Sequence, residues 1–214
     1  MTVKRLLTIV GAGPVFAVAR AIATDLEGEK RVVAVELPPD RIAETDVRSM
    51  LNRPPAESDV FAAIGLHALN HARADLCAKF AEAGYPSVTL VHRRASVERS
   101  AILAPNVLVC AGTSIGSDAV VEAGAVILDG ARIEAGARVG AFAWIGANVV
   151  IGFDASVGAH TILRSGVNVD AGVPIGDHCE LATPGLRQAA VVDRTFDTAA
   201  FEQPVRIYRG RCRA

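Results

Sequence analysis

Two pairs of histidines have spacings that could support chemistry. His160 and His178 are 18 residues apart, and His67 and His71 are four residues apart. A neutral imidazole can take a proton from a reacting group near pH 7, and it can also bind a metal ion. His67 and His71 would share one face of a predicted helix, where such a pair could hold a metal. Because no third ligand clusters with them in the sequence, we predict no metal site.

A glycine-rich turn is the next candidate. Gly11-Ala12-Gly13 follows an apolar segment and opens a predicted helix. Backbone N–H groups at such a turn can approach a phosphate at the N-terminus of the helix. The dinucleotide fingerprint is incomplete, because Phe16 stands where a third glycine would be and Pro14 lacks an N–H. A tight turn without a ligand explains the same residues, so both interpretations stay open.

The elements that must position these residues include a long six-residue repeat. An aliphatic residue stands at every sixth position from Val97 to Leu181 without a gap, and a small or compact residue stands two positions before each of them. A helix has a period of 3.6 and a strand a period of 2, so a period of six fits a short strand followed by a tight corner. Three hexads make one triangular coil. The sequence therefore predicts a parallel β-solenoid of about five coils.

The preceding segment alternates predicted strands and helices, which is typical of a small parallel α/β domain. We predict a Rossmann-like α/β domain over residues 1–92, a β-solenoid over 93–185 and a C-terminal tail without repeat over 186–214. The predicted strands are 5–10, 31–36, 59–64 and 87–91, and the main helices are about 15–26 and 67–83.

The repeat gives the spacing of His160 and His178 a meaning. Eighteen residues are one full coil, so the two rings should stack on one corner, roughly 4.8 Å apart, with Phe142 one coil further back. A stacked pair near a groove between subunits could supply a general base. Two exposed corner side chains would have the same spacing.

Composition excludes several classes of function. The formal net charge is −1, which gives no reason to expect binding to nucleic acid or to an anionic membrane. No apolar run approaches the roughly 20 residues that span a bilayer. The four cysteines have neither paired nor metal-binding spacing, so we expect reduced thiols in a cytoplasmic protein.

The order of the two domains, together with several short motifs, resembles the NeuD/PglD-like family of sugar O- and N-acyltransferases. The resemblance runs from Leu6 to about Ile175. Its motifs are the Gly-rich first turn, Ala63-Ile64-Gly65, Asn70-His71-Ala72-Arg73, and His92 leading into Ala95-Ser96-Val97.

The resemblance implies a left-handed parallel β-helix, a homotrimer, and an acyl-CoA, first of all acetyl-CoA, bound in the groove between neighbouring subunits. It also implies that the first domain holds a nucleotide-linked sugar. The positions that match this binding function are Gly11, Gly13, Gly65, Asn70 and Arg73. Since Trp144 directly precedes an inward-pointing isoleucine, we expect it to point outward and to be covered at the trimer interface, joined by Phe142 and Phe153.

The chain departs from this family at the expected catalytic positions. Ala135 stands where the family has its general-base histidine, and Trp144 where a second histidine is common. An alanine cannot accept a proton, so another residue would have to serve. Glu134, next to Ala135, is one candidate, although an ordinary solvated glutamate would look the same. His160 and His178 are the others.

Two functions fit these observations. The first is an acyl-CoA-dependent acyltransferase that acts on an amine or hydroxyl of a nucleotide-linked sugar in glycan or natural-product assembly. The alternative is a catalytically inactive family member that serves as a trimeric, nucleotide-sugar-binding scaffold. A basic tail, Arg206, Arg209, Arg211 and Arg213, could meet the phosphates of CoA or could simply be solvated.

Overall fold

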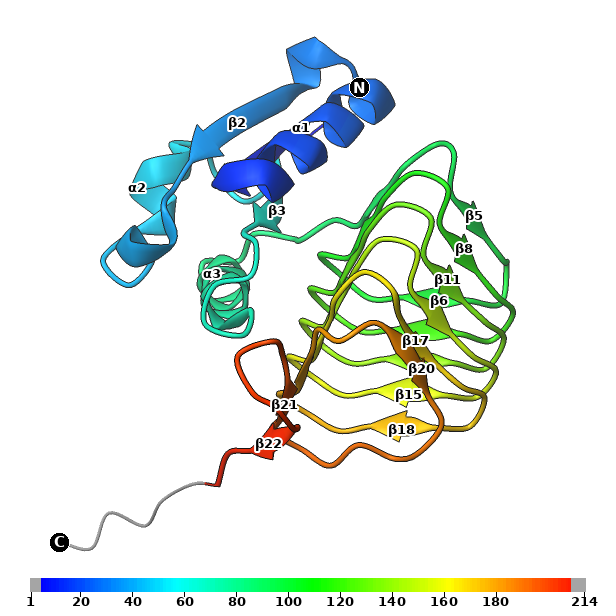
Figure 1. Ribbon diagram of the computed structural model, residues 1–214. Coiled ribbons are helices and arrows are strands. Elements are labelled where there is room, and N and C mark those ends of the chain that lie inside the picture. The colour runs from blue at the N-terminus through cyan, green and yellow to red at the C-terminus, as the bar shows by residue number, and fades with distance from the viewer. Residues whose placement is uncertain (1–4, 209–214) are drawn as a thin grey trace, which may run out of the picture.

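A computed structural model describes residues 5–208 and contains an α/β unit packed beside a β-solenoid (Figure 1). The α/β unit is built on a parallel sheet with the strand order β2-β1-β3. Its strands are β1 (Leu6–Gly11), β2 (Val32–Glu36) and β3 (Ser58–Ala63), and its helices are α1 (Gly13–Glu27), α2 (Val47–Leu51) and α3 (His71–Glu82), with single 3-10 turns at Glu29–Arg31 and Pro39–Arg41.

Local sequence explains the first strand and helix of this unit. Apolar side chains at three- and four-residue intervals bury one face of α1 against the sheet, and Pro14 suits its first turn. The strand before it ends at Gly11, where a Cβ would lie 2.0 Å from the carbonyl oxygen of Ala63. Glycine is therefore required at Gly11, because β1 and β3 approach too closely there for any side chain.

The six-residue repeat folds as predicted into a parallel β-solenoid with three faces (Figure 1). The first face contains β4 (Leu90–Val91), β7 (Leu108–Val109), β10 (Val126–Ile127), β13 (Trp144–Ile145), β16 (Ile162–Leu163) and β19 (Glu180–Leu181). The second contains β5 (Ser96–Val97), β8 (Ser114–Ile115), β11 (Arg132–Ile133), β14 (Val150–Ile151), β17 (Val167–Val169) and β20 (Gly185–Arg187). The third contains β6 (Ile102–Leu103), β9 (Val120–Val121), β12 (Arg138–Val139), β15 (Ser156–Val157) and β18 (Pro174–Ile175).

The register explains why the hexads have to be uninterrupted. Each strand pairs with the strand one coil away, so that Ile127 lies opposite Ile145 and Ile133 opposite Ile151. These aliphatic side chains fill the interior and are buried. The glycines that follow many of them allow neighbouring coils to stack closely. A Cβ on Gly140, for example, would lie 2.6 Å from the backbone nitrogen of Ala159.

Two predictions near the junction are wrong: the sheet to which residues 87–91 belong and the residue at which the second main helix begins. Residues 87–91 do not form a fourth strand of the α/β sheet. Ser87 makes only an isolated bridge to Val60, while β4 pairs with β7 as the first rung of the solenoid. The predicted helix from His67 begins only at α3, and His67 lies in the preceding turn. His67 and His71 are therefore not neighbours on one helical face.

The described part of the C-terminal segment is more ordered than the sequence predicts. After the hexads end, β20 still pairs with β17, β21 (Thr195–Asp197) pairs with β19, and β22 (Val205–Arg206) pairs antiparallel with β21. An ion pair between Arg187 and Asp197, 2.6 Å long, holds this cap together. The basic residues Arg209, Arg211 and Arg213 lie outside the described residues.

The α/β unit covers the first face of the solenoid. Trp144 points outward from the solenoid, as its position before Ile145 predicts, but only 8% of it is exposed. It belongs to a buried cluster that combines side chains of β1 and α1 with those of β7, β10 and β16. The prediction that a trimer partner covers Trp144 is therefore wrong, because this chain's own α/β unit covers it.

Within residues 5–208, no helix has both the length and the apolar character that a bilayer-spanning segment needs.

We expect Trp144→Ala to destabilise the junction between the two units. Replacing a buried tryptophan by alanine removes about 3–5 kcal/mol of stability, because it leaves a cavity as well as losing buried area. Urea unfolding followed by circular dichroism measures this loss. Phe201→Ala, at an exposed aromatic residue, is the control and should shift stability by no more than about 0.5 kcal/mol. Equal effects of the two substitutions would contradict the burial of Trp144.

Candidate functional site

One corner of the solenoid faces the α/β unit and carries most of its polar contacts. We call it the corner line; its residues, one coil apart and all with positive φ between 55° and 69°, are Asn106, Gly124, Phe142, His160 and His178. The corner lies between the third and the first face.

Asn106 joins the corner line to the edge of β3. Its side-chain oxygen accepts a hydrogen bond from the N–H of Ala62 at 2.7 Å, and its amide nitrogen donates to the carbonyl of Ala62 at 3.2 Å. One buried side chain thus pairs with both backbone groups of a residue in β3.

Arg73 joins α3 to the next two positions of the corner line. The side chain is fully buried and donates to the carbonyls of Gly124 (2.8 Å), Ile64 (2.7 Å) and Phe142 (3.1 Å). Within residues 5–208 no carboxylate pairs with it. Burial lowers the pKa of Arg73 to about 10, so it stays charged at neutral pH. Much of its hydrogen-bonding capacity is therefore used in holding the two units together.

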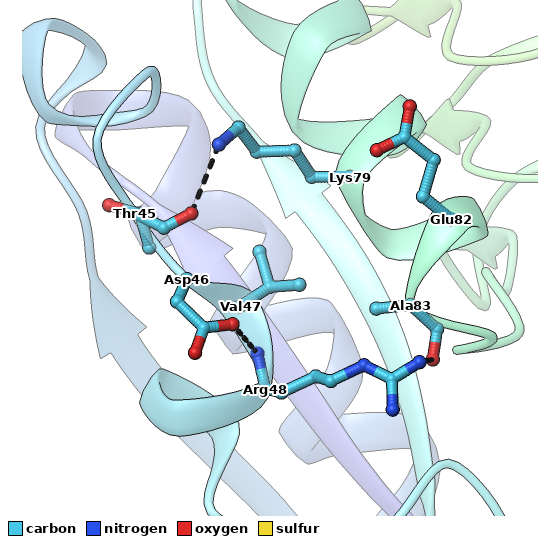
Figure 2. A pocket seen from close by; sticks show the side chains of 7 residues that line it. All are labelled: Thr45, Asp46, Val47, Arg48, Lys79, Glu82 and Ala83. Carbon is cyan, nitrogen blue, oxygen red and sulfur yellow. Dashed lines mark hydrogen bonds between the residues drawn. The ribbon is translucent and has the colours of Figure 1, made fainter.

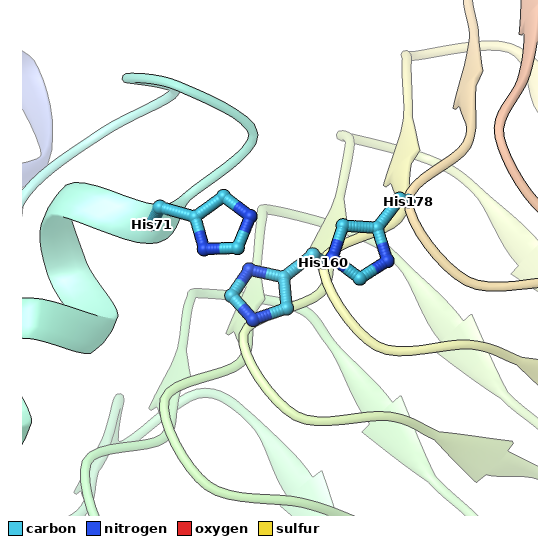
Figure 3. Close-up of side chains that lie close together, drawn as sticks. All are labelled: His71, His160 and His178. Carbon is cyan, nitrogen blue, oxygen red and sulfur yellow. The ribbon is translucent and has the colours of Figure 1, made fainter. Parts of the chain in front are cut away.

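The last two residues of the corner line stack with a histidine from α3 (Figure 3). The ring centroids of His160 and His178 are 5.0 Å apart, which confirms the predicted stacking, and Phe142 lies 5.4 Å from His160. His71 completes the cluster, with its centroid 4.1 Å from His160 and 5.4 Å from His178. The sequence did not predict that His71 would take part.

The surroundings of His160 and His178 favour the neutral forms of these two rings. Burial lowers the pKa of His160, and the positive charges of His71, His178 and Arg73 lower it further. The hydrogen bond to the carbonyl of Leu69 has the opposite effect and raises this pKa, but by less than burial lowers it. Burial also lowers the pKa of His178, with a further contribution from His71.

Glu134 and Ala135 lie elsewhere, in a groove on the second face. The groove has a volume of about 370 Å³ and is lined by residues of β5, β8 and β11 together with Ser117 and Phe153. Glu134 makes a 2.7 Å ion pair with Arg132, and 16% of its side chain is exposed. Phe153, one coil beyond Ala135, is 56% exposed. Within one chain, Glu134 and the pair His160–His178 therefore lie on different parts of the solenoid.

Three of the residues predicted to bind a nucleotide gather where β1 and β3 end. Gly11 contacts Ala63, and Gly13 opens α1 with φ of +72°. Gly65 lies beside the first turn of α1, where a Cβ added to it would be 3.8 Å from the side chain of Val15. This edge, at the carboxyl ends of parallel strands, is where open α/β sheets bind ligands. Asn70 lies instead beside Arg73 in the chain, is fully buried, and has no hydrogen-bond partner for its side-chain amide within the described residues.

A separate hollow of about 250 Å³ lies between α2 and α3 (Figure 2). Both of its cationic side chains already have partners, since Lys79 donates to the carbonyls of Ala43 and Thr45 at 3.0 Å and Arg48 donates to that of Ala83 at 3.1 Å. It contains none of the predicted site residues. We interpret it as the place where the loop before α2 is fastened to α3.

The architecture matches that of solved sugar acyltransferases. A histidine-to-alanine mutant of GDP-perosamine N-acetyltransferase from Caulobacter crescentus, solved in complex with CoA and GDP-perosamine, is 26% identical; the match covers 88% of this chain and 91% of that one, with a TM-score of 0.75. The acetyltransferase domain of PglB from Neisseria gonorrhoeae, in complex with acetyl coenzyme A, is 18% identical over 90% and 95% of the two chains, with a TM-score of 0.60, and shows the fold alone. The predicted resemblance to sugar acyltransferases of the hexapeptide-repeat type is confirmed.

The other comparisons add less. The family model described as the GMPPB C-terminal domain matches residues 86–182, which lie almost wholly in the solenoid. No curated protein matches this chain.

Sequence reasoning missed the role of the corner line as a whole. The 18-residue spacing that placed Phe142, His160 and His178 on one corner also connects Asn106 and Gly124, and that signal was available in the sequence. No signal in the sequence indicated that α3 would lie against this corner, because the contact joins two differently folded units.

We expect acid to weaken the junction. Burial lowers the pKa of His160 and of His178 in the folded protein. Between these lowered pKa values and the value of about 6.5 in the unfolded chain, the unfolded chain binds more protons than the folded protein does. The free energy of unfolding therefore falls as the pH is lowered through that interval. His178→Phe keeps an aromatic ring but removes a titrating group, so the stability of this variant should depend less on pH. Thermal unfolding between pH 8 and pH 5 measures the difference.

The control for this experiment is His67→Phe, because His67 lies outside the stacked cluster. Its pH dependence should equal that of the wild-type protein. A wild-type protein that gains stability on acidification would show that the stacked histidines are not held in their neutral forms.

Proposed function

We propose that this protein is an acyl-CoA-dependent acyltransferase that transfers an acyl group, first of all acetyl, to an amine or hydroxyl of a nucleotide-linked sugar. The observation that carries the proposal is the match over nine-tenths of the chain to an N-acetyltransferase solved with CoA and GDP-perosamine. The glycines at the end of β1 and β3 support a nucleotide site in the α/β unit, where Gly11, Gly13 and Gly65 would bring backbone close to the phosphates.

The groove on the second face supports a site for the acyl thioester. It runs along the strands beside Ala135, and one side of it is formed by the exposed ring of Phe153. A homotrimer would place a second solenoid against such a face and close the groove, and an exposed aromatic side chain is a common element of such an interface. We therefore propose that CoA lies between two subunits of a homotrimer.

Within the groove, Glu134 is our candidate for the general base. The neutral amine of the sugar attacks the thioester carbonyl carbon, the C–S bond of the tetrahedral intermediate breaks, and CoA leaves as a thiolate. The proton lost by the attacking nitrogen passes to the carboxylate of Glu134 and from there to the thiolate, which restores the carboxylate and gives the thiol of CoA. His160 and His178 are less suited to this step in the same chain, because they pack against α3 rather than line the groove.

The first experiment is calorimetric titration of the full chain with acetyl-CoA and, separately, with GDP- and UDP-linked amino sugars. We expect one acetyl-CoA site per chain and binding of at least one of the nucleotide sugars. Binding of a nucleotide sugar without any binding of acetyl-CoA or longer acyl-CoAs would contradict transfer and favour the non-catalytic scaffold.

Glu134→Gln tests the base. Removing a general base costs about 10²- to 10⁴-fold in rate, so kcat should fall by that amount while acetyl-CoA binding is kept. The matched control is Glu180→Gln, since Glu180 also pairs with an arginine at 2.7 Å and is exposed to a similar extent, 20% against 16% for Glu134, but lies on the first face. If Glu180→Gln slows transfer as much as Glu134→Gln, the loss comes from the ion pair and Glu134 is not the base.

A further inference from the structure

The three stacked histidines bring metal-ligand atoms from two separately folded parts of the chain to one place. His71 comes from the first turn of α3, and His160 and His178 come from the corner line (Figure 3). One ring nitrogen from each lies within 4.8 Å of the others. Because imidazole nitrogen is a common ligand of zinc and other late first-row metals, a set of three deserves a test that a lone histidine would not.

A hydrogen bond to a backbone carbonyl sets the tautomer of one of the three rings. Nδ1 of His160 lies 3.0 Å from the carbonyl oxygen of Leu69, which has no hydrogen to donate. Nδ1 must therefore carry the proton in this hydrogen bond, and Nε2 keeps its lone pair free. Proteins usually orient a metal-binding histidine in this way: one ring nitrogen binds the metal, and the N–H of the other donates to a carbonyl or carboxylate.

We propose that His71, His160 and His178 bind one divalent transition-metal ion, Zn²⁺ being the ion best suited to three imidazoles with a fourth position open to water. The exposed position of His71 leaves that fourth position facing solvent. A metal held in this way joins α3 directly to the corner line and adds to the contacts of Arg73 and Asn106. The proposal does not depend on the proposed acyl transfer.

Binding requires the rings to turn, because their nitrogens lie up to 4.8 Å apart and the stacked rings do not point their lone pairs at one centre. Tetrahedral zinc with Zn–N bonds of about 2.0–2.1 Å holds its ligand nitrogens roughly 3.3 Å apart. A nitrogen lone pair lies in the plane of its ring, and the three ring planes are nearly parallel, with interplanar angles of 16–29°. The lone pairs therefore do not converge on one point. His71 and His178 must therefore rotate toward His160, which the bond to Leu69 holds in place.

The charges around the cluster are mixed. Asp177 and Asp193 act on His178 in favour of a cation, whereas Arg194 acts against one, and Arg73 does the same at His160. Burial lowers the pKa of His160 and of His178 and so favours the neutral form in which each imidazole can bind a metal.

The test is calorimetric titration of untagged, chelator-treated full-length protein with ZnCl₂ at pH 7.5. We expect one site per chain, and a visible absorption spectrum of tetrahedral cobalt when Co²⁺ replaces zinc. His71→Ala and His178→Ala should each weaken zinc binding at least about tenfold to 100-fold, the loss that even the partners of metal ligands cause when they are removed. Zinc should raise the unfolding temperature of the wild type but not of these variants.

His67→Ala and His92→Ala are the matched controls, because they remove the two histidines outside the cluster. Both should bind zinc as the wild type does. Absence of stoichiometric binding by the wild type, retention of binding by His71→Ala and His178→Ala, or equal losses in the control variants would each overturn the proposal. Circular dichroism of every variant separates loss of the site from loss of the fold.

Discussion

The hydrogen bonds of Arg73 are the interaction on which the arrangement of the two units depends. The carbonyls of Gly124 and Phe142 accept no backbone hydrogen bond within the described residues, so the solenoid alone leaves them unsatisfied. Arg73 supplies both and binds Ile64 in the α/β unit with the same guanidinium. A hydrogen bond to a charged group contributes about 1.5–3 kcal/mol, and a buried carbonyl left without a partner costs about 1–3 kcal/mol. Among the residues that the structure describes, this buried cation has no carboxylate partner, but the carbonyls of Gly124 and Phe142 have no backbone donor and bind it instead.

The corner line shows how this junction shaped the residues of the repeat. A positive φ suits glycine and asparagine, but it strains the backbone of Phe142 by roughly 1 kcal/mol or more, and that of His160 and His178 likewise. Those side chains are held there by stacking on one another and on His71. Gly124, one coil earlier, makes room for the ring of Phe142, because a Cβ on Gly124 would lie 2.2 Å from it. Contacts with α3, rather than backbone preference, explain why aromatic rings occupy this corner.

The solenoid could be predicted from sequence because its period has one physical explanation, and fifteen uninterrupted hexads leave little room for another. The junction could not. Alternation places Trp144 on the outside of the solenoid, but nothing local says whether a partner subunit or the chain's own first domain covers it. The sequence placed the strand at 87–91 in the wrong sheet and did not predict β20, for a related reason: backbone hydrogen bonds extend the ladder at both ends without needing the side-chain repeat. Of the candidate site, the stack of His160 and His178 followed from the spacing, whereas His71 required knowledge of where α3 lies.

If the chain acts as the proposed transferase, catalysis depends more on positioning than on proton transfer at position 135, because Ala135 cannot accept a proton. The α/β unit is fixed to the first face through Arg73, Asn106 and Trp144, which leaves the second face, with its groove, open to a neighbouring subunit. In the proposed homotrimer, the distance between the sugar site at the ends of β1 and β3 and the thioester site in the groove would be set by this junction and by the symmetry of the trimer. Orientation alone can supply about 7–11 kcal/mol of a barrier, more than a general base usually does. In the proposed transferase, the interface between the two units would thus help to set the geometry of the reaction.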